Sequence, residues 1–165
     1  MYSVVTFPGV DAAEMITGVK CRAAVAADLP ACIGVRGRTR DNPLSAEHLA
    51  SLGVTPEGWA PLMERQQIQG FVAESASEIV GFCFGDQRSG EVLVLAVLPD
   101  VEGEGVGRGL LSLLTEILFC CGHHELWLAA SPHPDVRAHG FYRRLGWTWR
   151  GETDEIGDQI LHLGR

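Results

Sequence analysis

EVLVLAVLPDVEGEGVGRGLLSLLTEILFCC, residues 91–121, is the stretch that decides the fold. Its first part, Val92 to Leu98, is an almost unbroken apolar run. The run is too short for a typical helix and suits a strand buried inside a sheet. Pro99 ends the strand, because a proline has no backbone N–H to donate to a neighbouring strand. Glycines and then apolar residues at helical spacing follow, so the stretch predicts a strand, a glycine loop and a helix that ends near Gly122.

The predicted helix begins inside the glycine loop. The first N–H groups of a helix have no partner within the helix, and the helix dipole is positive at that end. Glycine also lets the backbone approach a ligand closely. These properties suit an anion, above all a phosphate group. A tight strand-to-helix turn that binds nothing explains the same glycines equally well.

Two common phosphate motifs are absent from this loop, whose glycines stand at 103, 105, 107 and 109. The dinucleotide fingerprint G-x-G-x-x-G fails in every register. The P-loop pattern fails because no Lys-Ser or Lys-Thr follows the glycines. A phosphate site here would therefore be a diphosphate cradle of another kind.

Two segments resemble motifs of the GNAT superfamily of N-acetyltransferases. Residues 102–107, EGEGVG, resemble its acetyl-CoA loop Arg/Gln-x-x-Gly-x-Gly/Ala, with Glu102 in place of Arg or Gln. Residues 135–147, DVRAHGFYRRLGW, resemble its downstream motif Asn-x-x-Ala-x-x-Phe-Tyr-x-x-x-Gly-Phe, with Asp135 and Trp147 as departures. The motifs follow each other in the family's order and spacing, and with their flanking strands they cover residues 78–163.

The remaining patterns predict a mixed sheet. Helices are expected to begin at Asp28, Ser45 and Asp135, each of these residues serving as N-cap, and a further helix is expected to open at residues 55–58. The order of elements indicates a mostly antiparallel sheet with a local parallel region. The resemblance implies the GNAT fold, an α/β (α+β) fold whose sheet has splayed middle strands and is flanked by helices. The predicted strands are 19–25, 71–74, 79–85, 92–98, 124–130, 147–153 and 159–163.

The length of 165 residues fits one domain, residues 1–165, in which residues 1–18 could be an N-terminal extension. Val4 to Phe7 could add a strand there. No apolar run reaches the length of a membrane span, and the N-terminus does not resemble a secretory signal. We therefore expect a cytoplasmic protein.

The resemblance implies acetyl-CoA as co-substrate. Backbone amides of the loop would hold its diphosphate, and its pantetheine arm would pair with the main chain of residues 95–97 between the splayed strands. Asp135 matches the asparagine that touches this arm, although a role as N-cap is a sufficient explanation. The predicted cofactor-binding residues are Leu95, Ala96, Val97, Gly103, Glu104, Gly105, Val106, Gly107, Arg108 and Asp135.

The charges around the loop are mixed. Arg108 would favour a diphosphate, whereas Glu102 and Glu104 would oppose it unless their carboxylates point to solvent. We interpret this departure as weaker cofactor binding or a relaxed cofactor preference.

Acyl transfer from a thioester to an amine needs a base for the amine, a donor for the oxyanion and an acid for the leaving thiolate. Tyr142 matches the family's tyrosine, whose hydroxyl lies near the thioester sulfur, and is the candidate acid. A core tyrosine with its hydroxyl at the edge is the alternative.

Glu91 is the candidate base. It occupies the place of a glutamate that some family members use, and strict alternation puts it on the face of Leu93, Leu95 and Val97, toward the cleft. A solvated carboxylate at a strand end is an equal alternative. Other members use a glutamate in the next strand, where this chain has Ala129, and a water relay is a further route.

The acceptor site is expected in the first helix–loop–helix region, where the family has one wall of that site. Arg40, Trp59 and Met63 could touch the acceptor, although a core stripe is the favoured explanation for Trp59 and Met63. The net charge of −8 argues against nucleic acid or an anionic membrane as partner. It is compatible with a cationic amine, and solubility alone also explains it.

The cysteines and histidines predict neither disulfides nor a metal site. The five cysteines are odd in number and lack C-x-x-C spacing, so reduced, mostly buried thiols are expected. The six histidines show no metal-ligand spacing. The free sheet edges and the C-terminal hairpin are compatible with a homodimer.

The leading hypothesis is an acetyl-CoA-dependent N-acetyltransferase acting on a primary amine of a small molecule or peptide. A non-catalytic acyl-CoA-binding sensor of the same fold is the alternative, and Glu102 and Asp135 keep it open. A third hypothesis is an interaction domain with an empty cleft.

Overall fold

The computed structural model describes residues 14–16 and 18–165, and one eight-stranded sheet extends through this part of the chain. Its strand order is β1-β2-β3-β4-β5-β6-β8-β7. Neighbouring strands are antiparallel except β5 and β6, which confirms the predicted mixed sheet. The predicted strand at Val4 to Phe7 lies outside the described residues. The strands are β1 Glu14–Ile16, β2 Val19–Ala23, β3 Ile68–Ser75, β4 Glu78–Asp86, β5 Glu91–Val97, β6 Glu125–Ala130, β7 Thr148–Thr153 and β8 Gln159–Gly164.

The sheet is split between β5 and β6. The two strands pair at one position, Glu91 with Trp127, at the start of β5. Along the rest of its length β5 pairs with β4 alone. The strands therefore separate toward the carboxyl end of β5, and the predicted splay of the middle strands is confirmed.

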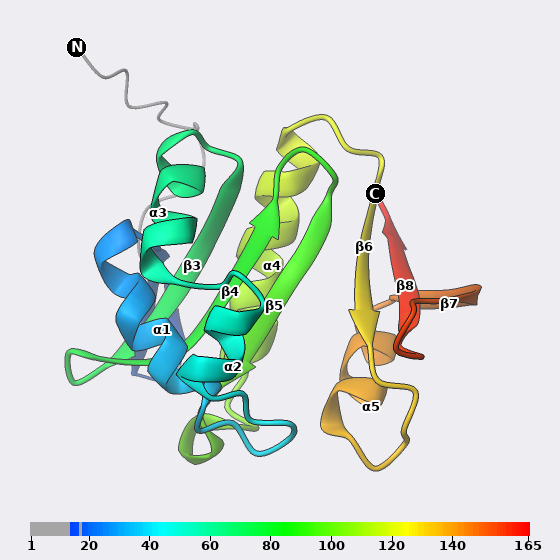
Figure 1. Ribbon diagram of the computed structural model, residues 1–165. Coiled ribbons are helices and arrows are strands. Elements are labelled where there is room, and N and C mark those ends of the chain that lie inside the picture. The colour runs from blue at the N-terminus through cyan, green and yellow to red at the C-terminus, as the bar shows by residue number, and fades with distance from the viewer. Residues whose placement is uncertain (1–13, 17) are drawn as a thin grey trace.

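Helices cover both faces of the sheet. Figure 1 shows α1, α2 and α3 in front of the sheet and α4 behind it, with α5 beside β6 and β8. None of the helices in residues 14–16 and 18–165 is long and apolar enough to cross a membrane. The helices are α1 Leu29–Arg36, α2 Ala46–Ser51, α3 Pro56–Glu64, α4 Val106–Cys120 and α5 Arg137–Arg144, with short 3-10 turns at Ala26–Asp28 and Pro99–Val101.

Each face of the sheet has its own apolar core. The predicted apolar stripe of α4 packs through Val106, Leu110 and Leu114 against one face, and Tyr142 and Trp147 join the same core. On the other face, α1 packs on β3, β4 and β5. The buried residues of this second core are Leu29, Cys32, Val35, Ile68, Val72, Phe82, Phe84 and Ala96.

The predicted cap at Ser45 is confirmed, and Thr55 caps the helix that was predicted to open there. The hydroxyl of Ser45 accepts a backbone N–H of the first turn of α2 at 3.1 Å, and that of Thr55 does the same for α3 at 3.0 Å. Asp28 occupies the predicted N-cap position of α1, but its carboxylate makes no capping bond to this helix. It accepts the N–H of Val25 at 2.8 Å, since a 3-10 turn precedes the helix.

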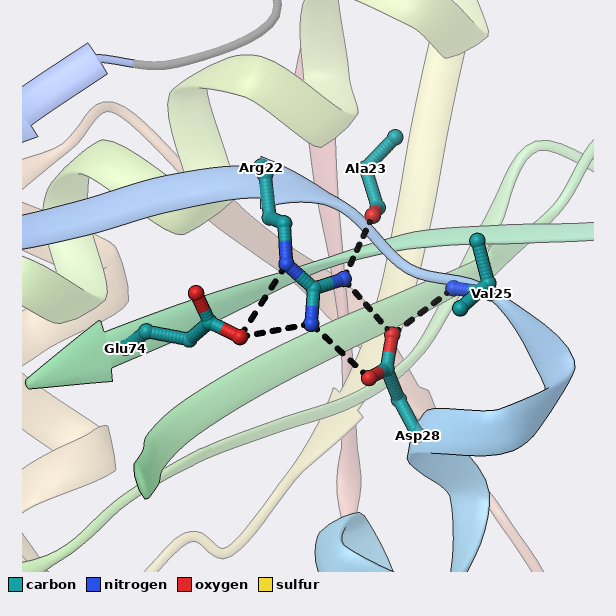
Figure 2. Close-up of polar contacts among 5 residues, drawn as sticks. All are labelled: Arg22, Ala23, Val25, Asp28 and Glu74. Carbon is teal, nitrogen blue, oxygen red and sulfur yellow. Dashed lines mark hydrogen bonds and ion pairs between the residues drawn. The ribbon is translucent and has the colours of Figure 1, made fainter. Parts of the chain in front are cut away.

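The carboxylate of Asp28 belongs to an ion-pair network that Figure 2 shows. The guanidinium of Arg22 donates to both Asp28 oxygens, at 2.8 and 2.9 Å, and to Glu74 Oε1 at 2.7 Å. The hydrogen bonds from Arg22 lower the pKa of the Asp28 carboxyl. The network ties β2 and β3 to the turn that enters α1.

Replacing Asp28→Asn should destabilise the protein by about 1–3 kcal/mol at pH 7, because one charged partner of Arg22 is lost in a nearly buried position. The folded-state pKa of Asp28 is lowered, so its contribution is complete above the unfolded value of about 4 and is lost as pH falls through the folded value. Urea unfolding at pH 7 and near pH 2 measures both effects. The exposed Glu116 supplies a control, Glu116→Gln, and an equal loss at both pH values would contradict the assignment.

Candidate active site

A cleft of about 1330 Å³ lies where β5 and β6 separate. Residues from both apolar cores line it, including Trp59 on the α1–α3 side and Tyr142 on the α4–α5 side. The cleft therefore passes through the sheet. Its volume is above the usual range for small-molecule sites, which leaves room for a large cofactor and a second molecule together.

The glycine loop forms one end of this cleft. Gly103 and Gly105 have φ angles of +79° and +86°, which residues with a Cβ rarely adopt. The first hydrogen bond of α4 runs from the N–H of Gly109 to the carbonyl of Gly105, at 2.9 Å. The amides of residues 106–108 precede that bond, and no side chain caps this helix start in the described chain. The loop thus offers N–H groups to an anion, as predicted.

Eight of the ten predicted cofactor-binding residues line the cleft. The other two are Glu104, which is exposed, and Val106, whose side chain is buried in the core. For Val106, only the backbone amide remains as a route to a ligand. The eight lining residues are Leu95, Ala96, Val97, Gly103, Gly105, Gly107, Arg108 and Asp135.

The charge of Glu102 is balanced by two arginines. Its Oε2 lies 2.9 Å from Arg40 Nε and 2.9 Å from Arg137 Nη1, and its side chain is 13% exposed. Arg40 comes from the loop between α1 and α2, and Arg137 begins α5. The two guanidinium groups offset the negative charge of Glu102, so the expected repulsion of a diphosphate by this carboxylate is reduced locally.

Asp135 does not cap α5, so that prediction is wrong. The helix begins at Arg137 with Val136 in the cap position, and Asp135 is exposed. The N–H of Arg137 donates to Asp41 Oδ2 at 3.1 Å. Asp41 stands 96 positions earlier in the chain, in the same loop as Arg40. This loop therefore contacts both α5 and the glycine loop.

Tyr142 lies on the wall of the cleft. Its side chain is 9% exposed and packs edge-on against Phe141 and Trp147, with ring centroids 5.1 and 6.1 Å away. Burial, and then the nearby Cys83, raises the pKa of the hydroxyl well above its ordinary value. The phenol is protonated at neutral pH, as a general acid must be, and the raised pKa makes it a weaker proton donor than an ordinary tyrosine.

Glu91 is not among the residues that line the cleft. The predicted alternation is wrong because the pairing of β4 with β5 shifts by one residue, which makes Leu93 the extra residue of a β-bulge. Val92 consequently packs in the same core as Leu95 and Val97. Glu91 immediately precedes Val92, so it lies on the opposite face of the strand from Val92, Leu95 and Val97.

The environment of Glu91 still perturbs its titration. Partial burial raises the pKa of its carboxyl, and Asp86, which faces it on β4, adds to the rise. A raised pKa suits a base, but the position outside the cleft does not bring this carboxylate to the ligands. Its role as base stays a prediction.

The thiol on the cleft wall is not activated. Cys32 of α1 lines the cleft but is 2% exposed, and burial raises its pKa to about 12. The protonated thiol is a poor nucleophile at neutral pH. All five cysteines are free, with Cys120 and Cys121 exposed and the other three buried as expected.

Sequence reasoning missed several charged residues of the cleft. Arg36, Asp41 and Arg137 all line it. The sequence feature that could have indicated a charged site here is the run RGRTR at residues 36–40. It places three arginines close together in a chain of net charge −8.

The model of the acetyltransferase (GNAT) family matches residues 40–147, which is more than half of the chain. The chain belongs to the GNAT acetyltransferase family. The match begins at Arg40 and ends at Trp147, so it contains the glycine loop, β5, β6 and α5 and most of the cleft wall.

The GNAT chain also resembles curated relatives over part of their length. It is 35% identical over 89 residues to mycothiol acetyltransferase of Streptomyces griseus, covering 47% of this chain and 26% of that protein. It is 34% identical over 95 residues to the Amycolatopsis mediterranei mycothiol acetyltransferase, covering 51% and 31%. The match thus spans between a quarter and a third of these relatives.

A solved structure supports the GNAT fold over nearly the whole chain. PaiA N-acetyltransferase from Thermoplasma acidophilum, solved in complex with coenzyme A, superposes with a TM-score of 0.73 at 22% identity. The superposition covers 89% of this chain and 99% of that one. At this identity the likeness shows the fold.

Glu102→Gln should raise the affinity for coenzyme A by roughly two- to tenfold at low ionic strength, because it removes a negative charge beside the glycine loop. The gain should shrink as salt is added. Calorimetric titration at two salt concentrations measures it, with the exposed Glu57→Gln as a variant of equal charge change. A loss of affinity would show instead that Glu102 serves the cofactor by holding Arg40 and Arg137 in place.

Proposed function

We propose that this GNAT protein is an acetyl-CoA-dependent N-acetyltransferase that transfers the acetyl group directly to a primary amine of a small molecule or peptide. The observation that carries the proposal is the cleft through the split sheet. Its wall includes amides at the start of α4 that no side chain of the described chain caps, and a protonated tyrosine. These parts supply an anion site, a channel and an acid in one continuous space.

The cofactor fits the loop and the split. A diphosphate suits the N–H groups before Gly109, and Arg108 adds a positive charge on the cleft wall. The main chain of residues 95–97 pairs only with β4, so its other edge is available to the amides of a pantetheine arm. The coenzyme A bound to PaiA supports the same cofactor here.

Direct transfer needs no covalent enzyme intermediate, because placing the amine beside the thioester supplies much of the rate. The amine nitrogen attacks the thioester carbonyl, the carbon–sulfur bond breaks, and coenzyme A leaves as a thiolate. The Tyr142 hydroxyl donates its proton to the sulfur and is restored from solvent. The proton that the amine loses passes to water in the cleft, since Glu91, the predicted base, is not among the lining residues.

Two measurements test the function. Calorimetric titration with acetyl-CoA should show binding, and release of free thiol should follow when a panel of primary amines is added. Absence of acetyl-CoA binding would refute both the transferase and the sensor. Tight binding without thiol release across the panel would favour the non-catalytic sensor.

Tyr142→Phe should lower kcat by about 100-fold or more while leaving the affinity for acetyl-CoA nearly unchanged, because only the acid for the leaving thiolate is removed. Steady-state kinetics and calorimetry give the two quantities, and a melting curve checks that the buried ring still packs. Unchanged turnover would remove Tyr142 from the mechanism.

Glu91→Gln should leave the acid limb of the pH–rate profile in place, with kcat/KM within about twofold of the parent, because its side chain lies outside the cleft. If the carboxylate were the base, the parent activity would fall as pH drops through its raised pKa, and the variant would lose that dependence together with most of its rate. The profile between pH 5 and 9 therefore decides the role of Glu91.

A further inference from the structure

Arg36 is the last residue of α1 and lines the acceptor side of the cleft. It continues a stripe of that helix whose other members, Leu29, Cys32 and Ile33, are apolar and line the same wall. The rest of this wall is also largely apolar. Its further apolar members are Leu44, Leu49, Leu52, Val54, Trp59, Phe82 and Phe84.

The guanidinium of Arg36 has neutral partners only. Its Nη1 donates to the hydroxyl of Thr39 at 3.1 Å and to the carbonyl of Asn42 at 2.6 Å. No carboxylate of the described chain lies within ion-pair distance, and neither Nε nor Nη2 has an acceptor there. Neither nitrogen is sealed in the interior. The two hydrogen bonds of Nη1 therefore hold the guanidinium in place, and its Nε–Nη2 edge is left without a hydrogen-bond acceptor in the described chain.

The other charges of this wall are already engaged. Among the lining residues between 29 and 59, the charged ones besides Arg36 are Arg40, which pairs with Glu102, and Asp41, which accepts the N–H of Arg137. Asp41 accepts a single neutral N–H and keeps its negative charge. Of the two arginines on this wall, Arg36 is the one without a carboxylate partner in the described chain.

A half-buried cation without a counter-ion is unfavourable. Burial lowers the pKa of Arg36, which reflects the loss of water around the guanidinium. An anion at the open edge would offset that loss. The two parallel N–H groups of such an edge match the two oxygens of a carboxylate, which is the strongest geometry for this pair.

We propose that the acceptor amine also carries a carboxylate, which binds the Nε–Nη2 edge of Arg36 while an apolar or aromatic body lies against the wall that Trp59 helps to form. The inference deepens the proposed acetyltransferase function and depends on it for the identity of the bound molecule as an acceptor. It names the substrate class as amino acids and related amphipathic amino carboxylates.

Matched pairs of amines test this class. Phenylalanine and phenethylamine differ by the carboxylate alone, as do leucine and isoamylamine. With acetyl-CoA at saturation, the amino acid of each pair should have the higher kcat/KM by about tenfold or more. Arg36→Gln should abolish this preference, and Arg36→Lys should retain part of it because the charge remains.

Binding gives a test that does not require turnover. In the presence of coenzyme A, 3-phenylpropanoate should bind at least about tenfold more tightly than 3-phenylpropanol, and Arg36→Gln should make the two equal. The control is Arg38→Gln, since Arg38 is exposed, lies outside the cleft lining and carries the same charge. It should keep the preference.

Several outcomes overturn the inference. They are equal binding of the two probes by the parent, binding of neither probe, and a preference that survives Arg36→Gln. A loss of acetyl-CoA affinity in Arg36→Gln would also overturn it, because the guanidinium would then serve the cofactor. Failure of the parent to bind acetyl-CoA is a separate result that refutes the proposed function, whereas normal binding and turnover without carboxylate preference refutes only this inference.

Discussion

The single pairing between Glu91 and Trp127 is the constraint on which the rest of the structure depends. A sheet normally satisfies its backbone polar groups on both edges of every inner strand, and β5 does so only toward β4. Its other edge therefore faces the cleft, where water or a ligand must complete the hydrogen bonds. The apolar cores on the two faces hold the halves of the sheet on either side of this opening, since α4 packs on β3, β4 and β5 while Tyr142 and Trp147 join β6 and β8.

Local patterns predicted those parts of the fold that local physics determines. The strand, glycine loop and helix of residues 91–121 formed as expected, and Ser45 and Thr55 cap their helices, because each depends on residues a few positions apart. The predicted face of Glu91 was wrong, because strict alternation assumes an unbroken pairing of the two strands. The bulge at Leu93 shifts the pairing by one residue. No apolar pattern within β5 marks that bulge, since Leu93 and its neighbours are all apolar.

The electrostatics of the site could not be predicted from spacing. Glu102 was expected to repel a diphosphate, but its partners come from positions 62 and 35 residues away. The start of α5 is likewise capped by Asp41 instead of Asp135. Net charge was a poor guide for the same reason: in a chain of −8 the cleft lining has more arginines than carboxylates. The arginines are Arg36, Arg40, Arg108, Arg137 and Arg144, and the carboxylates are Asp41, Glu102, Asp135 and Asp158. The fold sets local potential by bringing distant side chains together, whereas composition reports only their sum.

The loop between α1 and α2 connects the two halves of the site. Arg40 contacts the glycine loop through Glu102, Asp41 contacts the start of α5, and the carbonyl of Asn42 accepts from Arg36 on the acceptor wall. A cofactor that shifts Glu102 or Arg137 therefore alters contacts of the same short loop that positions the guanidinium. If binding at one site moves this loop, the linkage acts in both directions, and ligands of the two sites would change each other's affinity to the same extent. Glu102, which replaces the family's Arg or Gln, thus connects the two sides of the split sheet. Its one carboxylate forms an ion pair with an arginine from each side.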